Sequence, residues 1–481
     1  MTTTSAGPAP AASARGEGAG RPGRLLLVVL AAQFMALLDT FIVNVAAPTI
    51  GTELHASGSQ LQLVIAGYTI TYAVLLITGA RLGDRYGHRR VHLAGLAVFT
   101  LASLACGLGQ GAEQLIAFRL AQGAGSAVMI PQVLSLIQRT FTGEARVRAL
   151  GAYAAVLAVG AAAGQVLGGV LVSADLFGTS WRPVFLVNVP VGLALLLVGR
   201  RVLPRDDVTG RARRPLDLPG LVLLAAGVCA LTLPLVLGQE QGWPLWSWLS
   251  LAASAVLFLA FGGHEARLAR RGGQPLITPR VLRGPGMGLA VFRIAAVMAV
   301  NAGLLFALTL HVQGGLGHSP LRAGLTFAPT AVVFGLVGLT WRNWPRRCQP
   351  ALIPAGFALT AAAILATALI LREGGDGGLA LYPAFALVGA GLALGFGPAM
   401  TGALSTVRPE DAADASGLLA TVTQLGQLIG VAAFGALYLN RLDTPGGPGA
   451  HHSADALLWC AFALAALAVM GAVSGLVRIR R

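Results

Sequence analysis

Long apolar stretches alternate with short polar segments along almost the whole chain. A helix that crosses a lipid bilayer needs about 20 mostly apolar residues. Fourteen stretches come close to that length or exceed it, near residues 25–50, 61–80, 91–110, 114–138, 149–173, 183–199, 218–238, 244–262, 287–312, 323–340, 351–371, 379–404, 415–438 and 455–477. The pattern predicts an all-α polytopic membrane protein with 14 transmembrane helices and connections too short to hold a soluble domain.

Composition agrees with this interpretation, because 55% of the 481 residues are hydrophobic and only 11% are charged. A soluble protein of this size carries more charge. The net charge of +15 is compatible with nucleic-acid binding, but the basic residues lie in short clusters between apolar stretches. We therefore expect a lipid bilayer and no nucleic acid as partner. Four widely spaced cysteines fit neither a metal site nor a disulfide framework, and we expect no metal or other cofactor.

Arginine placement predicts the orientation. All 34 basic residues are arginines, and 28 of them fall on one side if the N-terminus is cytoplasmic. Cytoplasmic loops are enriched in basic residues. We therefore expect a multi-pass protein with both termini in the cytoplasm. The absence of lysine and the abundance of glycine and alanine suggest a GC-rich bacterial genome, so the expected location is a bacterial plasma membrane. The other six are Arg119, Arg182, Arg293, Arg322, Arg372 and Arg441.

A weak internal repeat divides the chain. The basic turn Gly79–Arg90 has a degraded counterpart at Gly338–Arg347, and both halves carry a glycine-rich fifth helix. Paired halves around a central path are a common transporter design. We predict a disordered cytoplasmic tail (1–24), an N-terminal six-helix bundle (25–203), two inserted helices with flanking loops (204–285), a C-terminal six-helix bundle (286–477) and a short tail (478–481).

Two charged residues within the predicted spans are candidates for proton coupling. Asp39 lies 14 residues past Leu25, at a depth of about 21 Å along the first helix. A carboxylate there normally faces a cavity or a partner, and it can bind and release a proton. Alternatively, Asp39 only ties helices together. Arg119 of the fourth helix stays charged and favours proton release from a nearby carboxyl group, or else it reaches the outer interface.

The turn after the second helix is a candidate cytoplasmic gate. Its glycines allow a tight turn and close helix approach, and Asp84 can face the positive N-terminus of another helix. The helix starting near Ala415 is a plausible partner. An ordinary basic loop is the alternative, although it needs neither the glycine spacing nor the aspartate. The gate candidates are Gly79, Gly83, Asp84, Arg85, Gly87, Arg89 and Arg90.

Small residues four apart in the fifth helix permit close packing, which is purely structural in most membrane helices. They lie in a segment with Gly160, Gly164, Gln165, Gly168 and Gly169. Polar side chains within other spans are candidates for a substrate cavity: Asn44, Gln122, Asn188, Asn301 and Gln424.

Together these segments resemble the major facilitator superfamily over nearly the whole chain. The turn Gly79–Arg90 is similar to its loop motif, Arg119–Gly125 to its proton-coupling motif, and Gly160–Gly169 to its antiporter motif. Leu38–Pro48, Trp181–Gly192 and Gly238–Trp243 resemble the fourteen-helix drug:proton antiporter branch. The resemblance implies two six-helix halves plus two extra helices.

The chain departs from the family pattern in three places. Gln165 stands where the antiporter motif usually has proline, so the kink expected there is in doubt and Gln165 becomes a candidate for substrate contact. The second copy of the loop motif lacks an aspartate. Apart from Asp39, the spans hold almost no carboxylates, which favours neutral, monocationic or zwitterionic substrates over dications.

The resemblance implies a monomeric proton-coupled efflux transporter that exports small lipophilic compounds or antibiotics by alternating access. A dedicated exporter or a proton symporter of one metabolite on the same fold is the alternative. A membrane enzyme or sensor is a remote one. His451–His452 is the only histidine pair and has no catalytic motif nearby, and no nucleotide-binding loop is present. We therefore expect the proton gradient to supply the energy.

Overall fold

The computed structural model describes residues 20–206, 217–238, 241–345, 347–372, 374–405, 407–408, 412–442 and 449–476. The expected tails therefore fall almost entirely outside the described residues. Within these ranges the secondary structure is entirely helical. The helices up to residue 202 are α1 (Gly20–Leu54), α2 (Gly58–Tyr86), α3 (His88–Leu108), α4 (Ala112–Thr140), α5 (Gly143–Ser173), η1 (Leu176–Gly178), α6 (Pro183–Leu186) and α7 (Asn188–Val202).

Two long helices and a short one follow: α8 (Leu218–Leu237), α9 (Leu245–Arg270) and α10 (Pro279–Leu282). The remaining helices are α11 (Met287–Leu310), η2 (His311–Gly315), α12 (Pro320–Thr340), η3 (Trp341–Asn343), η4 (Gln349–Ala351), α13 (Leu352–Ile370), η5 (Gly378–Ala380), α14 (Leu381–Ser405), α15 (Ala412–Leu442) and α16 (Ala450–Leu476). We call α1–α7 the N-terminal half, α8 and α9 the inserted pair, and α11–α16 the C-terminal half.

Thirteen segments in the described part of the chain are long and apolar enough to cross a membrane. The predicted sixth span is one of them, although α6 and α7 divide it at Val187. Helix α5 has 31 residues, of which Ala163–Ser173 counts as a shorter apolar stretch. The prediction of an all-helical, multi-pass membrane protein is therefore confirmed, while the count of fourteen spans stays a prediction.

Local sequence explains several helix starts. Ser57 accepts a hydrogen bond from the backbone N–H of Gln60, whose side chain accepts from the backbone N–H of Ser57. This reciprocal pair satisfies donors that the first turn of α2 would otherwise leave free. Ser319 caps α12 in the same position, with Pro320 in the first turn. Asp217 caps α8 by accepting from the N–H of Gly220.

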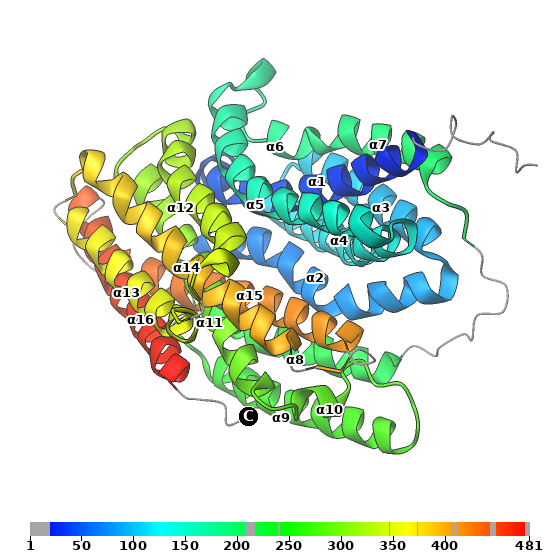
Figure 1. Ribbon diagram of the computed structural model, residues 1–481. Helices are drawn as coiled ribbons and strands as arrows, with labels where there is room; N and C mark the ends of the chain where they lie inside the picture. The colour runs from blue at the N-terminus through cyan, green and yellow to red at the C-terminus, as the bar shows by residue number, and fades with distance from the viewer. Residues whose placement is uncertain are drawn as a thin grey trace, which may run out of the picture.

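The helices of each half pack mainly with one another, and the halves meet along two seams. One seam joins α2 to α15 and the other joins α5 to α12. Figure 1 shows the N-terminal half (blue to teal) above, the C-terminal half (yellow-green to red) at the left, and the inserted pair (green) below. Helix α8 contacts both α2 and α15. The inserted pair therefore lies against the first seam.

Small residues bring α5 and α12 close together. A Cβ atom at Gly169 would lie 2.7 Å from Cα of Leu321, and one at Gly324 would lie 2.4 Å from the carbonyl oxygen of Gln165. Neither position has space for a side chain. The second seam therefore depends on glycine on both helices.

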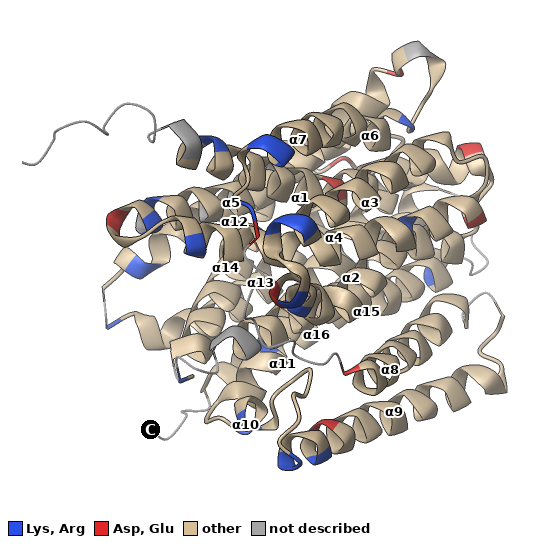
Figure 2. Ribbon diagram, turned by 90° about the vertical axis from the view of Figure 1, so that its right-hand side faces the viewer, with Lys and Arg blue, Asp and Glu red and all other residues tan. Residues whose placement is uncertain are grey.

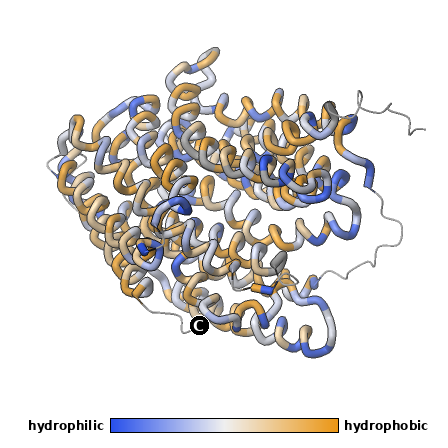
Figure 3. Tube along the Cα trace, viewed as in Figure 1, coloured by the Kyte–Doolittle hydropathy of each residue, from blue (hydrophilic) through white to orange (hydrophobic). Residues whose placement is uncertain are grey.

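The polar residues gather at the two ends of the helix bundle (Figure 3). We call the end with the α2–α3 and α4–α5 connections the Arg-rich end, and the other the opposite end. Arginines mark several helix ends in Figure 2, which faces the right-hand side of Figure 1. Large apolar side chains such as Leu259 of α9, which is 77% exposed, cover the outside. Such a surface fits contact with lipid.

Candidate functional site

Asp39 of α1 and Arg119 of α4 form a buried ion pair. Nη1 of Arg119 lies 2.6 Å from Oδ2 of Asp39, and the two side chains are 1% and 0% exposed. Removing two charges from water is costly unless the pair has good geometry and further hydrogen bonds. The alternative that Arg119 reaches the outer interface is wrong, because its side chain is enclosed by protein.

A set of neutral side chains completes the hydrogen bonding of this pair. Oδ1 of Asp39 accepts from Nε2 of Gln122 at 2.7 Å and from Nδ2 of Asn188 at 2.9 Å. Arg119 donates through Nη1 to Oε1 of Gln122 at 2.6 Å and through Nε to the carbonyl oxygen of Val64 at 3.0 Å. Gln122 also donates to Oγ of Ser103 at 2.7 Å. The network thus joins α1, α2, α3, α4 and the start of α7.

Aromatic rings enclose the guanidinium group. The ring centre of Tyr68 lies 4.6 Å from Cζ of Arg119, and that of Phe185 lies 5.8 Å away. Cation–π contact of this kind stabilises a desolvated arginine. The Tyr68 hydroxyl donates to Oγ of Ser126 at 2.9 Å, which fixes the ring. Tyr68 therefore forms one wall of the ion-pair site.

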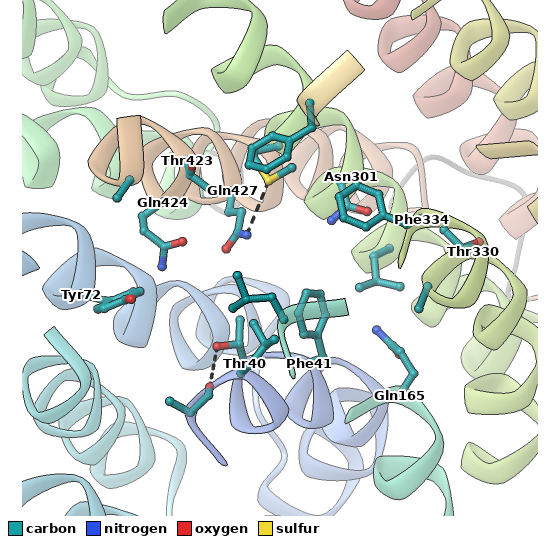
Figure 4. Close-up of a pocket in the computed structure, with 18 of the residues that line it drawn as sticks. Thr40, Phe41, Tyr72, Gln165, Asn301, Thr330, Phe334, Thr423, Gln424 and Gln427 are labelled. Atoms are coloured by element: carbon teal, nitrogen blue, oxygen red, sulfur yellow. Dashed lines mark hydrogen bonds between the residues drawn. The ribbon is translucent and has the colours of Figure 1, made fainter. Parts of the chain in front are cut away.

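A cavity of about 490 Å³ lies between the two halves. Tyr68 and Thr40 belong to its lining, but Asp39 and Arg119 do not. The tyrosine ring thus separates the ion pair from the cavity. The cavity polar groups come from both halves and include Gln33, Thr40, Tyr72, Tyr153, Gln165, Asn301, Thr330, Thr423, Gln424 and Gln427. Figure 4 shows Thr40 and Gln165 on one side and Asn301, Gln424 and Gln427 on the other.

The predicted cavity residues divide into two groups. Asn301, Gln424 and Gln165 line the cavity. Gln122 and Asn188 do not line it, because their amides bind Asp39. Asn44 also lies outside the lining.

Nδ2 of Asn44 donates to the carbonyl oxygen of Thr40 one turn earlier in α1. Sequence reasoning missed the cavity-lining Tyr72, Thr423 and Gln427. Each is a polar residue inside an apolar span, and that was the available signal.

The opposite end of the molecule is held closed by contacts between the halves. Nε2 of Gln313 donates to the carbonyl oxygen of Val45 at 2.8 Å. The N–H of Leu321 donates to Oγ of Ser173 at 3.0 Å. At Gly58, a Cβ atom would lie 2.7 Å from the side chain of Leu439. Access to the cavity is therefore blocked at this end.

The predicted gate glycines pack α2 against α4. A Cβ atom at Gly79 would lie 2.0 Å from the carbonyl oxygen of Ala127, and one at Gly83 would lie 1.9 Å from Oε1 of Gln132. Nε2 of Gln132 donates to the carbonyl oxygen of Gly79 at 2.7 Å. Gly79 and Gly83 therefore allow α2 and α4 to pack closely within the N-terminal half.

An unforeseen carboxylate caps the next helix. Oδ1 and Oδ2 of Asp206 accept from the backbone N–H groups of Arg89 and Arg90, each at 3.0 Å. Gly87 has a φ of +99°, and a Cβ atom there would lie 2.2 Å from Cγ of Asp206. Glycine is therefore required for both the turn and the cap. Nη2 of the Arg89 side chain donates to the carbonyl oxygen of Arg200.

Asp84 is half exposed and lies 3.6 Å from His88 and 4.0 Å from Arg139. The sequence predicts that Asp84 contacts the start of α15. The residues just before that helix, 409–411, lie outside the described part of the chain, and this contact stays a prediction. Arg85 stacks over the ring of Tyr86 at 5.2 Å.

The glycines of α5 have packing partners. Cβ atoms at Gly160, Gly164 and Gly168 would each come within 3.0 Å of α1, at Leu37, Phe41 and Ile42. The structural interpretation of this stretch therefore accounts for the glycines. Gln165 is different, because its side chain points into the cavity (Figure 4).

Comparison with known proteins adds the family. The family model described as Major Facilitator Superfamily matches residues 29–431. The chain belongs to the major facilitator superfamily. It is accordingly a membrane transporter that acts on small molecules, not an enzyme.

Curated relatives in this superfamily include named export proteins. The chain is 40% identical to the cephamycin export protein of Amycolatopsis lactamdurans, over 92% of this chain and 91% of that protein. It is 38% identical to the probable actinorhodin transporter of Streptomyces coelicolor, over 92% and 75%. It is 33% identical to the tetracenomycin C resistance and export protein of Streptomyces glaucescens, over 88% and 77%.

Solved structures agree on the fold. A bacterial homologue of the human lysosomal transporter Spinster, in an inward-facing and unoccupied conformation, matches with a TM-score of 0.68 and 19% identity over 96% of this chain and 97% of that one. An auto-inhibited peptide transporter of the POT family matches with a TM-score of 0.68 and 17% identity, over 95% and 98%. These matches extend to the whole described helix bundle.

Proposed function

We propose that this major facilitator protein is a proton-coupled exporter of small organic compounds in a bacterial plasma membrane, with fourteen spans, both termini in the cytoplasm and a monomer as the working unit. The observation that carries the proposal is the buried Asp39–Arg119 pair beside a cavity between the halves. A titratable carboxyl group at this depth is a natural proton acceptor. The named activities of the relatives favour export over uptake.

Proton binding at Asp39 changes the energy of the whole network. It removes the negative charge and leaves Arg119 as an uncompensated buried cation, which costs about 3–5 kcal/mol. Because Gln122 binds both members of the pair, it must also change its bonding. A conformation that gives Arg119 a new partner or water relieves this cost. Protonation thus favours one of two conformations, as alternating access requires.

The cavity is coupled to the pair through α1 and α2. Thr40 follows Asp39 directly in α1 and lines the cavity, and the Tyr68 ring contacts both the cavity and Arg119. A substrate that presses on Thr40 or Tyr68 therefore acts on the ion pair without touching it. Substrate binding and proton binding therefore compete because each changes the positions of Thr40 and Tyr68.

The lining favours uncharged substrates with aromatic or amide-like groups. Its residues are apolar, hydroxyl or amide side chains, and no charged residue is among them. A compound with a net charge would lose its hydration there without compensation. Antibiotics and related secreted metabolites fit this chemistry. Of the neutral, monocationic and zwitterionic classes expected from the sequence, the lining favours the neutral and zwitterionic ones.

The orientation predicted from the arginines makes the Arg-rich end cytoplasmic. Cavity residues extend toward that end, since Tyr153 lies ten residues after the start of α5 and Met400 lies five before the end of α14. The opposite end is closed by the contacts of Gln313 and Leu321. This conformation would load substrate from the cytoplasm.

Inside-out vesicles from a strain without its own efflux pumps test the proposal. Vesicles are energised to an acidic interior, and proton leak is recorded as uncharged antibiotics and dyes are added. We expect leak with wild type and with the exposed control Asp376→Asn, and none with Asp39→Asn. Coupling that survives in Asp39→Asn would remove Asp39 from the mechanism. Failure of every compound would favour a dedicated transporter of one metabolite.

A further inference from the structure

Three side chains that can bind metal meet at the Arg-rich end of the inserted pair. Asp217 stands at the start of α8, and His264 and Glu265 stand near the end of α9. Their ligand atoms all lie within 4.8 Å of one another. Nε2 of His264 lies 2.8 Å from Oδ1 of Asp217. The three residues are brought together by the antiparallel packing of α8 and α9 (Figure 1).

The two carboxylates point unpartnered oxygens at the same place. Asp217 and Glu265 are 6% and 2% exposed, and neither Oδ2 of Asp217 nor Oε1 of Glu265 has a hydrogen-bond partner among the described residues. A Cβ atom at Gly220 would lie 2.3 Å from the first oxygen and 2.6 Å from the second. Both oxygens therefore converge over the space that Gly220 leaves open.

The other oxygen of each carboxylate is fixed by the backbone. Oδ1 of Asp217 accepts from the N–H of Gly220 at 2.9 Å, and Oε2 of Glu265 accepts from the N–H of Ile277 at 2.7 Å. Ligands of bound metals are commonly held by such outer hydrogen bonds. Two buried carboxylate oxygens facing each other repel unless a proton or a metal cation lies between them.

We propose that Asp217, His264 and Glu265 bind a divalent first-row transition metal ion. Two carboxylate oxygens and one imidazole nitrogen suit Zn²⁺ or Mn²⁺ and leave room for a water ligand. His264 is 29% exposed, so the ion can reach the site from the Arg-rich end. The four cysteines and the other seven histidines of the sequence play no part in this site.

The metal would join α8, α9 and the segment that leads to the C-terminal half. Glu265 holds that segment at Ile277, and Arg81 of α2 donates to the carbonyl oxygens of Gln274 and Pro275. The site thus lies where the inserted pair, the N-terminal half and the path to α11 meet. Bound metal would stabilise this junction whether or not the proton proposal holds.

Metal binding to the purified full chain tests the proposal, using an affinity tag without histidines. Zn²⁺ and Mn²⁺ are titrated by calorimetry in chelator-free buffer, bound metal is counted after dialysis, and Tm is recorded with and without metal. We expect one equivalent bound and a higher Tm. His264→Ala and Glu265→Gln should each weaken binding at least tenfold, as should Gly220→Ala, which keeps all three ligands but fills the space between them.

The control is His451→Ala with His452→Ala, which removes the histidine pair at the start of α16 and should retain the bound equivalent. Co²⁺ absorption gives a second readout, because its bands report the ligand set of wild type directly. Absence of a stoichiometric metal in wild type would overturn the proposal. So would binding that is unchanged in all three variants, or binding lost only in the histidine-pair control.

Discussion

The buried arginine of the N-terminal half faces a carboxylate, whereas the buried arginine of the C-terminal half faces a serine among the described residues. Arg119 pairs with Asp39. Arg293 of α11 is 6% exposed and donates to Oγ of Ser474 at 3.2 Å and to the carbonyl oxygen of Ser474. The carboxylates of the C-terminal helices, Asp414 and Asp455, stand in the first two turns of α15 and α16.

This difference indicates a division of roles between two similar halves. Under the proposed mechanism, the N-terminal half holds the carboxyl group that binds the proton. The C-terminal half contributes neutral amides such as Asn301, Gln424 and Gln427 to the cavity. Because the ion pair lies in one half while the cavity lining comes from both, mutations can test whether proton coupling and substrate contact are separable.

The largest effect is expected from removing one charge of the pair. Arg119→Gln leaves Asp39 buried without its cation and should destabilise the protein by about 3–5 kcal/mol. Arg293→Gln should cost less, about 1–3 kcal/mol, because its partners are neutral. Thermal unfolding in detergent, followed by tryptophan fluorescence, measures both.

The double variant Asp39→Asn with Arg119→Gln is the matched control for the single change. It should recover much of the lost stability without recovering proton-coupled transport. An equal loss of stability in the Arg119 and Arg293 variants would contradict the proposed difference between the halves.

The next effect concerns the seam where the halves meet at the opposite end. Gln62 of α2 is fully buried, and its amide nitrogen and oxygen have no hydrogen-bond partner in the described part of the chain. A Cβ atom at Gly435 of α15 would lie 3.2 Å from Cδ of Gln62. Gln62→Leu removes the desolvation cost and should favour the closed opposite end by about 1–3 kcal/mol.

Electron-spin distances across the opposite end, between labels in the α1–α2 and α13–α14 connections, measure this shift. We expect the fraction with a short distance to increase in Gln62→Leu and to stay unchanged in the exposed control Gln110→Leu. A larger open fraction in Gln62→Leu would show that the unpartnered amide does not oppose closure.

A smaller effect is expected from replacing a cavity glutamine of the C-terminal half, Gln424, and it should differ in kind from the effect of replacing Gln122 in the N-terminal half. Gln424→Leu removes one hydrogen-bonding group from the cavity and should change KM by about 2–10-fold while proton coupling is retained. Gln122→Leu should uncouple transport, because Gln122 binds both Asp39 and Arg119. Substrate-induced proton flux in proteoliposomes distinguishes them. Uncoupling by Gln424→Leu would contradict the division of roles.

The smallest effect is expected at an exposed ion pair. Nη2 of Arg322 donates to Oδ2 of Asp376 at 2.7 Å, and this bond lowers the pKa of Asp376 from its usual 3.8. A lowered pKa stabilises the fold at pH values above the usual pKa, and this contribution is lost as the pH falls through the lowered pKa of the folded state. Asp376→Asn should therefore lower Tm by the same small amount at every pH between 5 and 8, and a difference that changes with pH in that range would contradict the assignment.

The sequence predicted the helical fold because membrane spans depend on long apolar stretches, which are visible residue by residue. It also indicated Asp39 and Arg119 individually, since each is a charge inside such a stretch. It did not reveal that Gln122 and Asn188 complete the pair. Polar amides in spans look the same whether they face a cavity or a buried charge.

Contacts between distant segments could not be predicted. Asp206 follows a basic cluster and shows no motif, yet it caps α3. Asp217 and His264 are 47 residues apart, and only the packing of α8 on α9 joins them. The cysteine and histidine spacing therefore predicted no metal ligands, while the folded chain places three candidates together.

The ring of Tyr68, which stands between the ion pair and the cavity, has an electrical consequence under the proposed mechanism. A cargo that never touches the proton acceptor cannot alter how many protons each cycle returns. With one titrating carboxylate, export of a neutral or zwitterionic compound would move one net positive charge inward per turnover. Export of a monovalent cation in exchange for one proton would instead move no net charge across the membrane. The membrane voltage would therefore accelerate the first kind of export and leave the second unaffected.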